Sequence, residues 1–328
     1  LNHSLGGSIT GNVSNAGLIY WQNLNQTLTI NGNYTGVAGS KLSLETYLGG
    51  DSSATDKLHV TWNTSGSTAI TVRPVAGSPG AQTVNGINIV QVDGTSAAGS
   101  FTLAAPVKAG AYQYVLKQGS AVDANDWYLN STYNCALNNS CSVTPDTPIY
   151  RPGVANYVSG QTANAEQGFH QLSALHQRMG EQKSVHADGR QTWLRAYHTT
   201  QDNDGETQFG YKQRITGFQI GQEILARGLG DGGTERAAIA IDYANSYAKF
   251  TDRMRTLANL STDTGHMDAQ SVALGGYYTR MDKDGCYVDL VGQVSSLRNV
   301  FHDSYGGQAT QKGWRAALSG EVGRPVAQ

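Results

Sequence analysis

Cysteines are the residues of this sequence whose type and spacing most directly suggest chemistry. Cys135 and Cys141 lie six positions apart in a polar segment, and Cys286 is far away. Such a short loop can close as a disulfide in an oxidising compartment. Two free thiols or half of a metal site are the alternatives, but no His cluster or second Cys pair accompanies the loop. We interpret it as a disulfide loop.

Paired acidic residues are the second candidate for chemistry. Asp51 and Asp56 could act as a general acid and base, but they flank a Ser/Ala/Thr turn, so we expect both to face solvent. The segment Asp202–Glu206 resembles part of a calcium loop, lacks the remaining ligands, and is interpreted as a hairpin turn. The Gly-rich segment Gly94–Gly99 is not followed by a helical pattern, as a phosphate-binding loop requires. The sequence therefore predicts no catalytic, cofactor-binding or metal-binding residue, and a protein that is not an enzyme.

Composition sets the class of fold that these residues belong to. The chain has 328 residues with 40 Gly, 7 Pro, 15% charged residues and a net charge of −2. Soluble domains average about 25% charged residues and about 7% Gly. The charge balance gives no basic excess for binding nucleic acid, and no apolar run is long enough for a transmembrane helix. Abundant uncharged polar residues favour β-ladders and turns.

The N-terminus, which lacks Met, is interpreted as an internal start with any leader removed upstream. Asn-x-Ser/Thr sites are interpreted as products of an Asn- and Thr-rich surface rather than as glycan acceptors; they include Asn2, Asn12, Asn25, Asn33, Asn63, Asn130 and Asn259.

Short apolar-polar-apolar triplets mark the first third of the chain. Their starts are 14, 16, 12, 17 and 14 residues apart, and Gly, Asn, Ser and Asp separate them. Triplets are short for a sandwich and suit a solenoid, in which each strand stacks on the next. A β-sandwich is the alternative. The triplets are Leu28–Ile30, Leu42–Leu44, Leu58–Val60, Ile70–Val72, Ile87–Ile89 and Phe101–Leu103.

A boundary and a helix follow the triplets. Residues 134–158 hold the Cys loop and three prolines, which indicates a linker. Residues 159–183 have a helical period, with an apolar stripe and a polar, weakly charged opposite face. This pattern fits either a surface helix on a soluble core or a helix inside a wet, polar tube. The stripe consists of Phe169, Leu172, Leu175 and Met179.

Long segments that alternate with a period of two begin near residue 190. We count about six, each long enough for the ~9–11 residues of a membrane-spanning β-strand. Tyr and Trp residues lie near their ends and hydrophilic turns separate them, which favours a membrane barrel over half-buried soluble strands. The segments are 191–199, 209–224, 237–250, 271–281, 285–296 and 314–322.

Several blocks, in order along nearly the whole chain, resemble the C-terminal part of bacterial type V autotransporters of the pertactin and AIDA-type adhesin kind. They cover the autochaperone region, the linker helix and the first barrel strand of that family. The blocks are Leu42–Asp51, Asp56–Leu58, Gly94–Leu103, Gly110–Tyr114, Asn125–Leu129, Tyr150–Pro152, Leu175–Glu181 and Trp193–Arg195.

The resemblance implies an all-β fold with three parts. These are the end of a right-handed parallel β-helix, a linker α-helix, and a partial antiparallel transmembrane β-barrel with about six of the family's twelve strands. Half a barrel leaves unpaired edges in lipid, so we expect the sequence to be a fragment. The implied segments are 1–46, last passenger coils; 47–133, autochaperone region; 134–158, linker with the Cys loop; 159–184, pore-threading helix; and 185–328, the N-terminal half of the barrel.

The resemblance also implies a function and a location. The barrel would lie in the bacterial outer membrane, in contact with its lipid, and would export and display a passenger at the cell surface. The resemblance implies that this passenger is an adhesin. Barrel-assembly machinery and periplasmic chaperones are the implied partners, with no cofactor and no nucleic acid, and folding of the solenoid would draw the chain outward. The alternative is the C-terminal part of a secreted β-helix enzyme, a polysaccharide lyase or protease, whose active site lies upstream.

Overall fold

The computed structural model describes residues 2–3, 6–133, 147–172, 175, 189–206 and 208–324, and the chain divides into two compact units. One comprises Leu1–Arg151 with Met254–Leu260, and the other comprises Pro152–Arg253 with Ser261–Gln328. Each unit is described by itself. Among the described residues, no helix combines the length and the apolar character needed to span a membrane.

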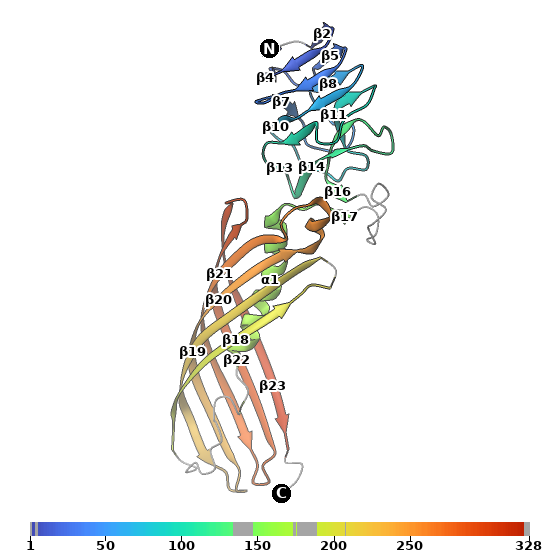
Figure 1. The fold of residues 1–328 in the computed structure, drawn as a ribbon. Helices are drawn as coiled ribbons and strands as arrows, with labels where there is room; N and C mark the ends of the chain where they lie inside the picture. Colours follow the sequence, from blue (N-terminus) through green and yellow to red (C-terminus); the bar gives the residue numbers. More distant parts are fainter. Residues whose placement is uncertain are drawn as a thin grey trace. The chain divides into compact units, whose positions relative to one another are not determined.

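The first unit is a solenoid of short parallel strands in three sheets (Figure 1). Each of the first three coils contributes one strand to each sheet. The first sheet contains β1 (Asn2–His3), β4 (Leu18–Trp21), β7 (Lys41–Thr46), β10 (Thr68–Pro74) and β12 (Phe101–Leu103). The second contains β2 (Gly7–Thr10), β5 (Thr27–Asn31), β8 (Lys57–Val60) and β11 (Ile87–Val92), and the third contains β3 (Val13–Asn15), β6 (Tyr34–Gly36) and β9 (Thr64–Gly66).

The predicted triplets form the core of this solenoid, but their stacking order differs from the expectation. Leu28 pairs in register with Leu58, and Leu58 with Val90, whereas Leu42 pairs with Ile70. Successive triplets therefore alternate between two sheets, and each stacks on the next but one. The reason is that one coil holds two triplets separated by a third strand, so the observed spacing is half a coil.

An antiparallel cap ends the solenoid. β15 (Trp127–Asn130) pairs antiparallel with β11, and β14 (Tyr112–Gln118) and β13 (Val107–Ala109) continue the sheet. Two short strands, β16 (Thr132–Tyr133) and β17 (Thr147–Pro148), follow. Asp126 fixes the junction because its carboxylate accepts hydrogen bonds from the Val92 amide (2.8 Å) and the Asn88 side chain (2.6 Å). The antiparallel strands cover the edge that another coil would otherwise need to occupy.

A ladder of asparagines accounts for three of the Asn-x-Ser/Thr sites. Asn12, Asn33 and Asn63 occupy equivalent turns of successive coils. The Asn12 side-chain oxygen accepts from the Asn33 amide at 2.9 Å, and the Asn33 oxygen accepts from the Asn63 amide at 3.0 Å. Asn63 repeats the contact with the Thr95 amide at 2.8 Å. These side chains join the coils, which is a structural role at the turns.

The Asp51 and Asp56 carboxylates also bind backbone amides. Asp51 accepts from the amides of Val84 (2.9 Å), Asn85 (2.8 Å) and Gly86 (3.1 Å). Asp56 is fully buried and accepts from the amides of Gln26 (3.1 Å) and Glu45 (2.7 Å), and its burial raises the pKa of the carboxyl. The expectation that both face solvent is wrong for Asp56, because unpaired amides between coils need an acceptor.

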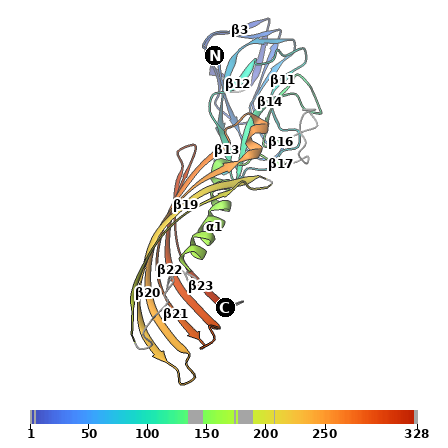
Figure 2. The same ribbon diagram turned by 60° about the horizontal axis from the view of Figure 1, so that its bottom comes forward.

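The second unit is a helix on the concave face of a curved antiparallel sheet (Figures 1 and 2). The helix, α1 (Pro152–Gln171), precedes six strands that pair in chain order. They are β18 (Thr192–Asn203), β19 (Phe209–Gly228), β20 (Thr234–Asp252), β21 (Asp263–Met281), β22 (Tyr287–Asp303) and β23 (Gln308–Gly323). Between β20 and β21 the chain forms a short 3-10 helix, η2 (Arg253–Ala258), which belongs to the first unit from Met254 on.

Two sequence-based boundaries in this unit are wrong. Most strands extend well beyond the predicted segments, because their outer halves carry polar residues on both faces and show no apolar alternation. The helix begins at Pro152, seven residues before residue 159, because Pro suits the first helical turn and the Gly, Ser and Asn that follow weaken the sequence signal. Met179, Cys135 and Cys141 lie outside the described residues.

Candidate functional site

The concave face of the six-stranded sheet is lined by polar and small side chains. Because strands alternate their side chains between two faces, one residue in two reaches this face. Amides, hydroxyls, alanines and glycines make up much of it, and a cluster of larger side chains, Tyr211, Phe250, Met267 and Phe301, lies at the end where α1 begins. Such a lining offers hydrogen-bond partners to a polypeptide while leaving room for it. Representative members are Gln213, Gln219, Ala240, Asp242, Ala244, Ser246, Ser271, Gln293, Ser295 and Asn299.

Helix α1 contacts this lining with a polar stripe. The stripe contains Asn156, Gly160, Ala163, Gln167 and Gln171, spaced by three or four residues as one helical face requires. The Asn156 side chain donates to the carbonyls of Thr264 (3.2 Å) and His302 (3.1 Å). Toward the other end of the helix, Gln213 donates to the Ala163 carbonyl at 2.9 Å. The interface therefore combines amide hydrogen bonds with apolar packing, since Ala163 belongs to one buried apolar cluster with Met267 and Phe301.

The predicted apolar stripe is not the face that contacts the sheet. Phe169 is 66% exposed, while Leu175 is buried and Leu172 is intermediate. The prediction is wrong because an apolar stripe marks the buried face only where the partner surface is apolar, and much of the concave face that α1 contacts is polar. Of the two alternatives, a surface helix on a soluble core and a helix inside a wet, polar tube, the largely polar concave face around α1 favours the second.

The last turn of α1 is held by a charged cluster. Gln171 donates to the Asp242 carboxylate at 2.5 Å, and the Tyr197 hydroxyl donates to both oxygens of that carboxylate at 3.1 Å. Arg315 donates to the Asn164 carbonyl at 2.7 Å and also to the Gln171 side chain. Arg315 of β23 thus contacts α1 directly, while Tyr197 of β18 is connected to its last turn through Asp242. Hydrogen bonds to charged groups are the stronger kind, worth about 1.5–3 kcal/mol each.

Two glycines allow the helix to approach the sheet closely. A Cβ at Gly160 would lie 2.7 Å from the Phe301 ring, and a Cβ at Gly168 would lie 2.7 Å from the Arg315 guanidinium carbon. Neither distance is compatible with a larger residue unless the wall moves. The glycines that lower helix propensity therefore position α1 against the lining.

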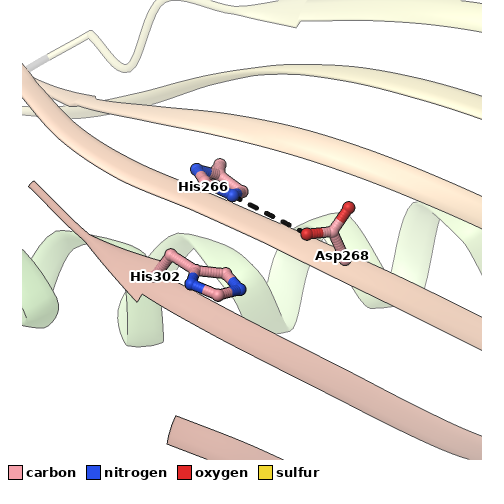
Figure 3. A group of neighbouring side chains, drawn as sticks. All are labelled: His266, Asp268 and His302. Atoms are coloured by element: carbon pink, nitrogen blue, oxygen red, sulfur yellow. Dashed lines mark ion pairs between the residues drawn. The ribbon is translucent and has the colours of Figure 1, made fainter. Parts of the chain in front are cut away.

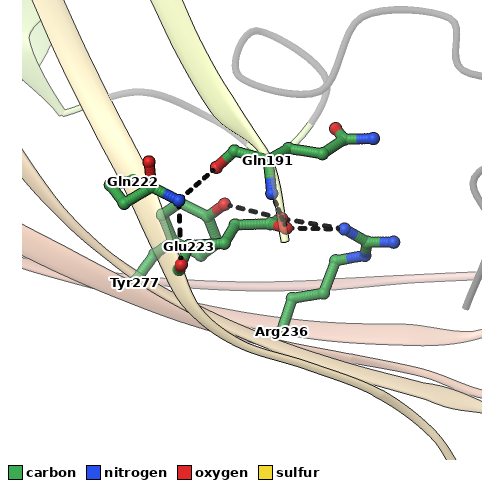
Figure 4. A network of polar contacts seen from close by, with 5 residues as sticks. All are labelled: Gln191, Gln222, Glu223, Arg236 and Tyr277. Carbon is green, nitrogen blue, oxygen red and sulfur yellow. Dashed lines mark hydrogen bonds and ion pairs between the residues drawn. The ribbon is translucent and has the colours of Figure 1, made fainter. Parts of the chain in front are cut away.

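A buried ion pair lies on the concave face near the start of β18 (Figure 4). Arg236 donates to both oxygens of Glu223, at 2.9 and 2.8 Å, and both side chains are almost fully buried. Glu223 also accepts from the Gln191 amide (3.0 Å) and the Tyr277 hydroxyl (3.3 Å). Gln222 donates to the Gln191 carbonyl at 3.3 Å. The network ties the chain just before β18 to β19, β20 and β21.

The convex face carries an apolar band. Ile239 and Ile241 of β20 point outward and are 53% and 56% exposed. The Phe218 and Tyr243 rings contact at 5.7 Å, and Trp314 lies in the same cross-strand row. An exposed apolar band bounded by aromatic residues is typical of a β-sheet that faces lipid. Other outward members are Leu194, Ile220, Ile224, Val272, Leu274, Leu290, Val294 and Leu318.

Beyond the aromatic row, toward the end of the sheet where α1 begins, the convex face becomes polar. The first row past it contains His198, Thr216, Asn245, Gln270, Arg298 and Lys312. We call this part of the convex face the polar collar. The polar collar explains why the strands extend beyond the segments of apolar alternation. In the collar the strands stay hydrogen-bonded to one another, but the convex face carries no apolar residues that a sequence pattern could show.

The turn and cysteine predictions for this unit can also be placed. β18 ends at Asn203, whose side-chain oxygen accepts from the Gly205 amide at 3.0 Å, so the Asp202–Glu206 segment is the predicted hairpin turn. Asp202 pairs with Lys212 at 2.6 Å. Cys286 is an exposed free thiol in the turn before β22. The sequence pattern placed it inside the alternating segment 285–296, but β22 begins one residue later, at Tyr287.

Two family models match the chain. "Autochaperone Domain Type 1" matches residues 8–116, and "Autotransporter beta-domain" matches residues 192–328. The first falls on the solenoid and part of its cap, and the second on the six-stranded sheet. The autochaperone match begins before residue 47 and ends before residue 133, the bounds expected from the sequence.

Curated relatives agree with the family models. The uncharacterized protein YdeU of Escherichia coli K12 is 32% identical over 80% of this chain and 58% of its own length. The adhesin BmaC autotransporter of Brucella suis is 40% identical over 47% of this chain and 5% of its length. The autotransporter adhesin AIDA-I of Escherichia coli is 33% identical over 76% of this chain and 18% of its length. The chain thus spans little more than half, or much less, of the relatives it matches.

Proposed function

Because this chain belongs to the bacterial autotransporters, we propose that it is the secretion and anchoring module of an outer-membrane protein that exports and displays its own β-helical passenger. The observation that carries the proposal is the two-faced sheet of the second unit. Its convex face has an apolar band fit for lipid, and its concave face holds α1 through amide and charged hydrogen bonds. A polypeptide segment inside a polar lumen is what an exporter leaves behind when its passenger has crossed.

The solenoid cap supplies the second part of the mechanism. Export needs a source of free energy, and a solenoid gains stability each time a coil stacks on a finished neighbour. The antiparallel cap of β13, β14 and β15 gives the C-terminal coil a closed end. We infer that this end folds first outside the cell and that later coils stack on it, which disfavours backward movement of the chain.

The passenger is proposed to be an adhesin without enzymatic activity. Two relatives carry adhesin in their names, and the acidic pair that could have suggested catalysis instead binds backbone amides. Assembly of the barrel by the cell's barrel-assembly machinery, with periplasmic chaperones holding the unfolded chain, is part of the same proposal.

Surface proteolysis of whole cells tests the proposal. The full-length protein should fractionate with the outer membrane and migrate differently in gels before and after boiling, as folded barrels do. Protease added to intact cells should reach the passenger but not the barrel. A variant without residues 192–324 should leave the passenger inside the cell. Recovery of the full-length protein as a soluble periplasmic species would overturn the proposal.

A further inference from the structure

Three potential metal ligands lie together on the polar collar (Figure 3). His266 in β21 is directly opposite His302 in β22, and Asp268 lies two residues further along β21 on the same face. The two imidazole rings stack at 4.8 Å with an angle of 18° between their planes. A ligand atom of each side chain lies within 4.8 Å of the others, and His266 Nε2 is 3.7 Å from the Asp268 carboxylate.

Neighbouring charges leave this group available to a cation. Lys249, which is opposite His266 on β20, is paired with Asp263 at 2.8 Å. Arg214 lies over the Tyr247 ring, 5.6 Å from its centroid. Within the described parts of the chain, Asp268 has no ion pair apart from that with His266. Its negative charge is therefore free to offset a bound cation.

The strands also hold the group rigidly. β21 and β22 pair over nearly their whole length, and β20 pairs with β21 on the other side. The Tyr247 ring packs on His266 with centroids 5.3 Å apart. The paired strands therefore hold the backbone of all three residues at fixed spacing, so that only side-chain rotation is needed to bind an ion.

We propose that His266, Asp268 and His302 bind a divalent transition-metal cation such as Zn²⁺. Two imidazole nitrogens and one carboxylate oxygen are a donor set that zinc, nickel and copper accept. Zinc bonds of about 2.0–2.2 Å place tetrahedral ligands roughly 3.3–3.5 Å apart, so the side chains need only a modest χ rotation to close on the ion. A fourth position stays open to water. The site goes beyond the secretion function and does not depend on it.

Zinc titration of the purified full-length protein in detergent tests the site. His302→Asn and His266→Asn should each weaken binding of one Zn²⁺ per chain by at least about tenfold, since second-shell losses alone cost 10–100-fold. Asp268→Asn should weaken it by a similar factor. His198→Asn is the matched control, because His198 lies in the same collar and its ring is hydrogen-bonded to Thr216 at 2.7 Å. This control should bind zinc as the wild type does.

X-ray absorption at the zinc edge identifies the ligands directly. The bound ion should show two imidazoles and light oxygen or nitrogen donors, with no sulfur. Sulfur ligation would assign the zinc to cysteines and overturn the proposal, as would wild-type binding no tighter than that of His302→Asn. Heat-modifiable migration of each variant shows that its barrel has assembled, so a loss of binding cannot be attributed to misfolding.

Discussion

Leu58→Ala is expected to destabilise the solenoid from its centre. Leu58 has no exposed surface and lies in register between Leu28 and Val90, which are equally buried. Replacing a buried leucine by alanine costs about 2–5 kcal/mol. Because backbone ladders hold both neighbouring coils at fixed spacing, the cavity cannot collapse, and the loss should fall in the upper half of that range.

Pulse proteolysis at the cell surface measures this loss. Cells that display the full-length protein are equilibrated in urea and exposed briefly to protease, and the urea concentration that makes the passenger sensitive is recorded. With a denaturant dependence of about 1–3 kcal/mol per molar urea, a loss of about 3.5–5 kcal/mol should lower that concentration by roughly 1–5 M.

Leu18→Ala is the matched control, since the same atoms are removed from a side chain that is 49% exposed. Its effect should be well under half that of Leu58→Ala. Leu58→Met, which conserves volume, should cost less than about 1.5 kcal/mol. Equal midpoints for Leu58→Ala and the wild type would refute the inference that the stacked apolar row stabilises the passenger end.

Three further predictions concern the sheet and its helix. Ile241→Arg should cost about 2–4 kcal/mol in barrel assembly because it places a charge in the apolar band. Asn245→Arg, on the same face of β20 but in the polar collar, should be tolerated. The amount of heat-modifiable protein in outer membranes compares the two variants, and equal yields would contradict the lipid-facing assignment. Gly160→Leu should force α1 away from Phe301, so that an engineered protease site in α1 is cleaved faster than in wild type; unchanged cleavage would show that the close approach is dispensable. Arg315→Ala removes charged hydrogen bonds of about 1.5–3 kcal/mol each from the last turns of α1. Because a loosened helix blocks the lumen less well, the ion conductance of the full-length barrel in planar bilayers should rise. Conductance equal to that of the wild type would contradict the inference that this cluster holds α1 in the lumen.

Much of the architecture could be predicted from periodicity. The triplets and the long alternating segments gave the solenoid and the six strands, because burial on one face of a strand leaves a period of two. What periodicity could not show was which triplets stack on which. That depends on a third strand in each coil, and residues such as Tyr34–Gly36 carry little apolar signal.

The site itself was mostly beyond the reach of sequence patterns. Apolar stripes indicate a buried face only when the partner surface is apolar, and α1 binds a polar wall through Asn156, Gln167 and Gln171. A stripe of Asn, Gly and Gln at helical spacing was the available signal. Likewise, the buried Asp56 and the His266–His302 pair depend on cross-strand register, which one sequence does not specify.

Depth profiling along β20 tests the central claim that this sheet separates lipid from a polar lumen. Spin labels on single cysteines at positions 238–249 of the full-length protein, in lipid vesicles, report collisions with oxygen, which concentrates in lipid, and with a water-soluble nickel complex. Oxygen collisions should peak at Ile239 and Ile241 and fall at Ala240 and Asp242, and nickel collisions should rise on the outward face at Asn245 and Lys249. Oxygen accessibility without this alternation, or nickel accessibility equal along the outward face, would contradict the account.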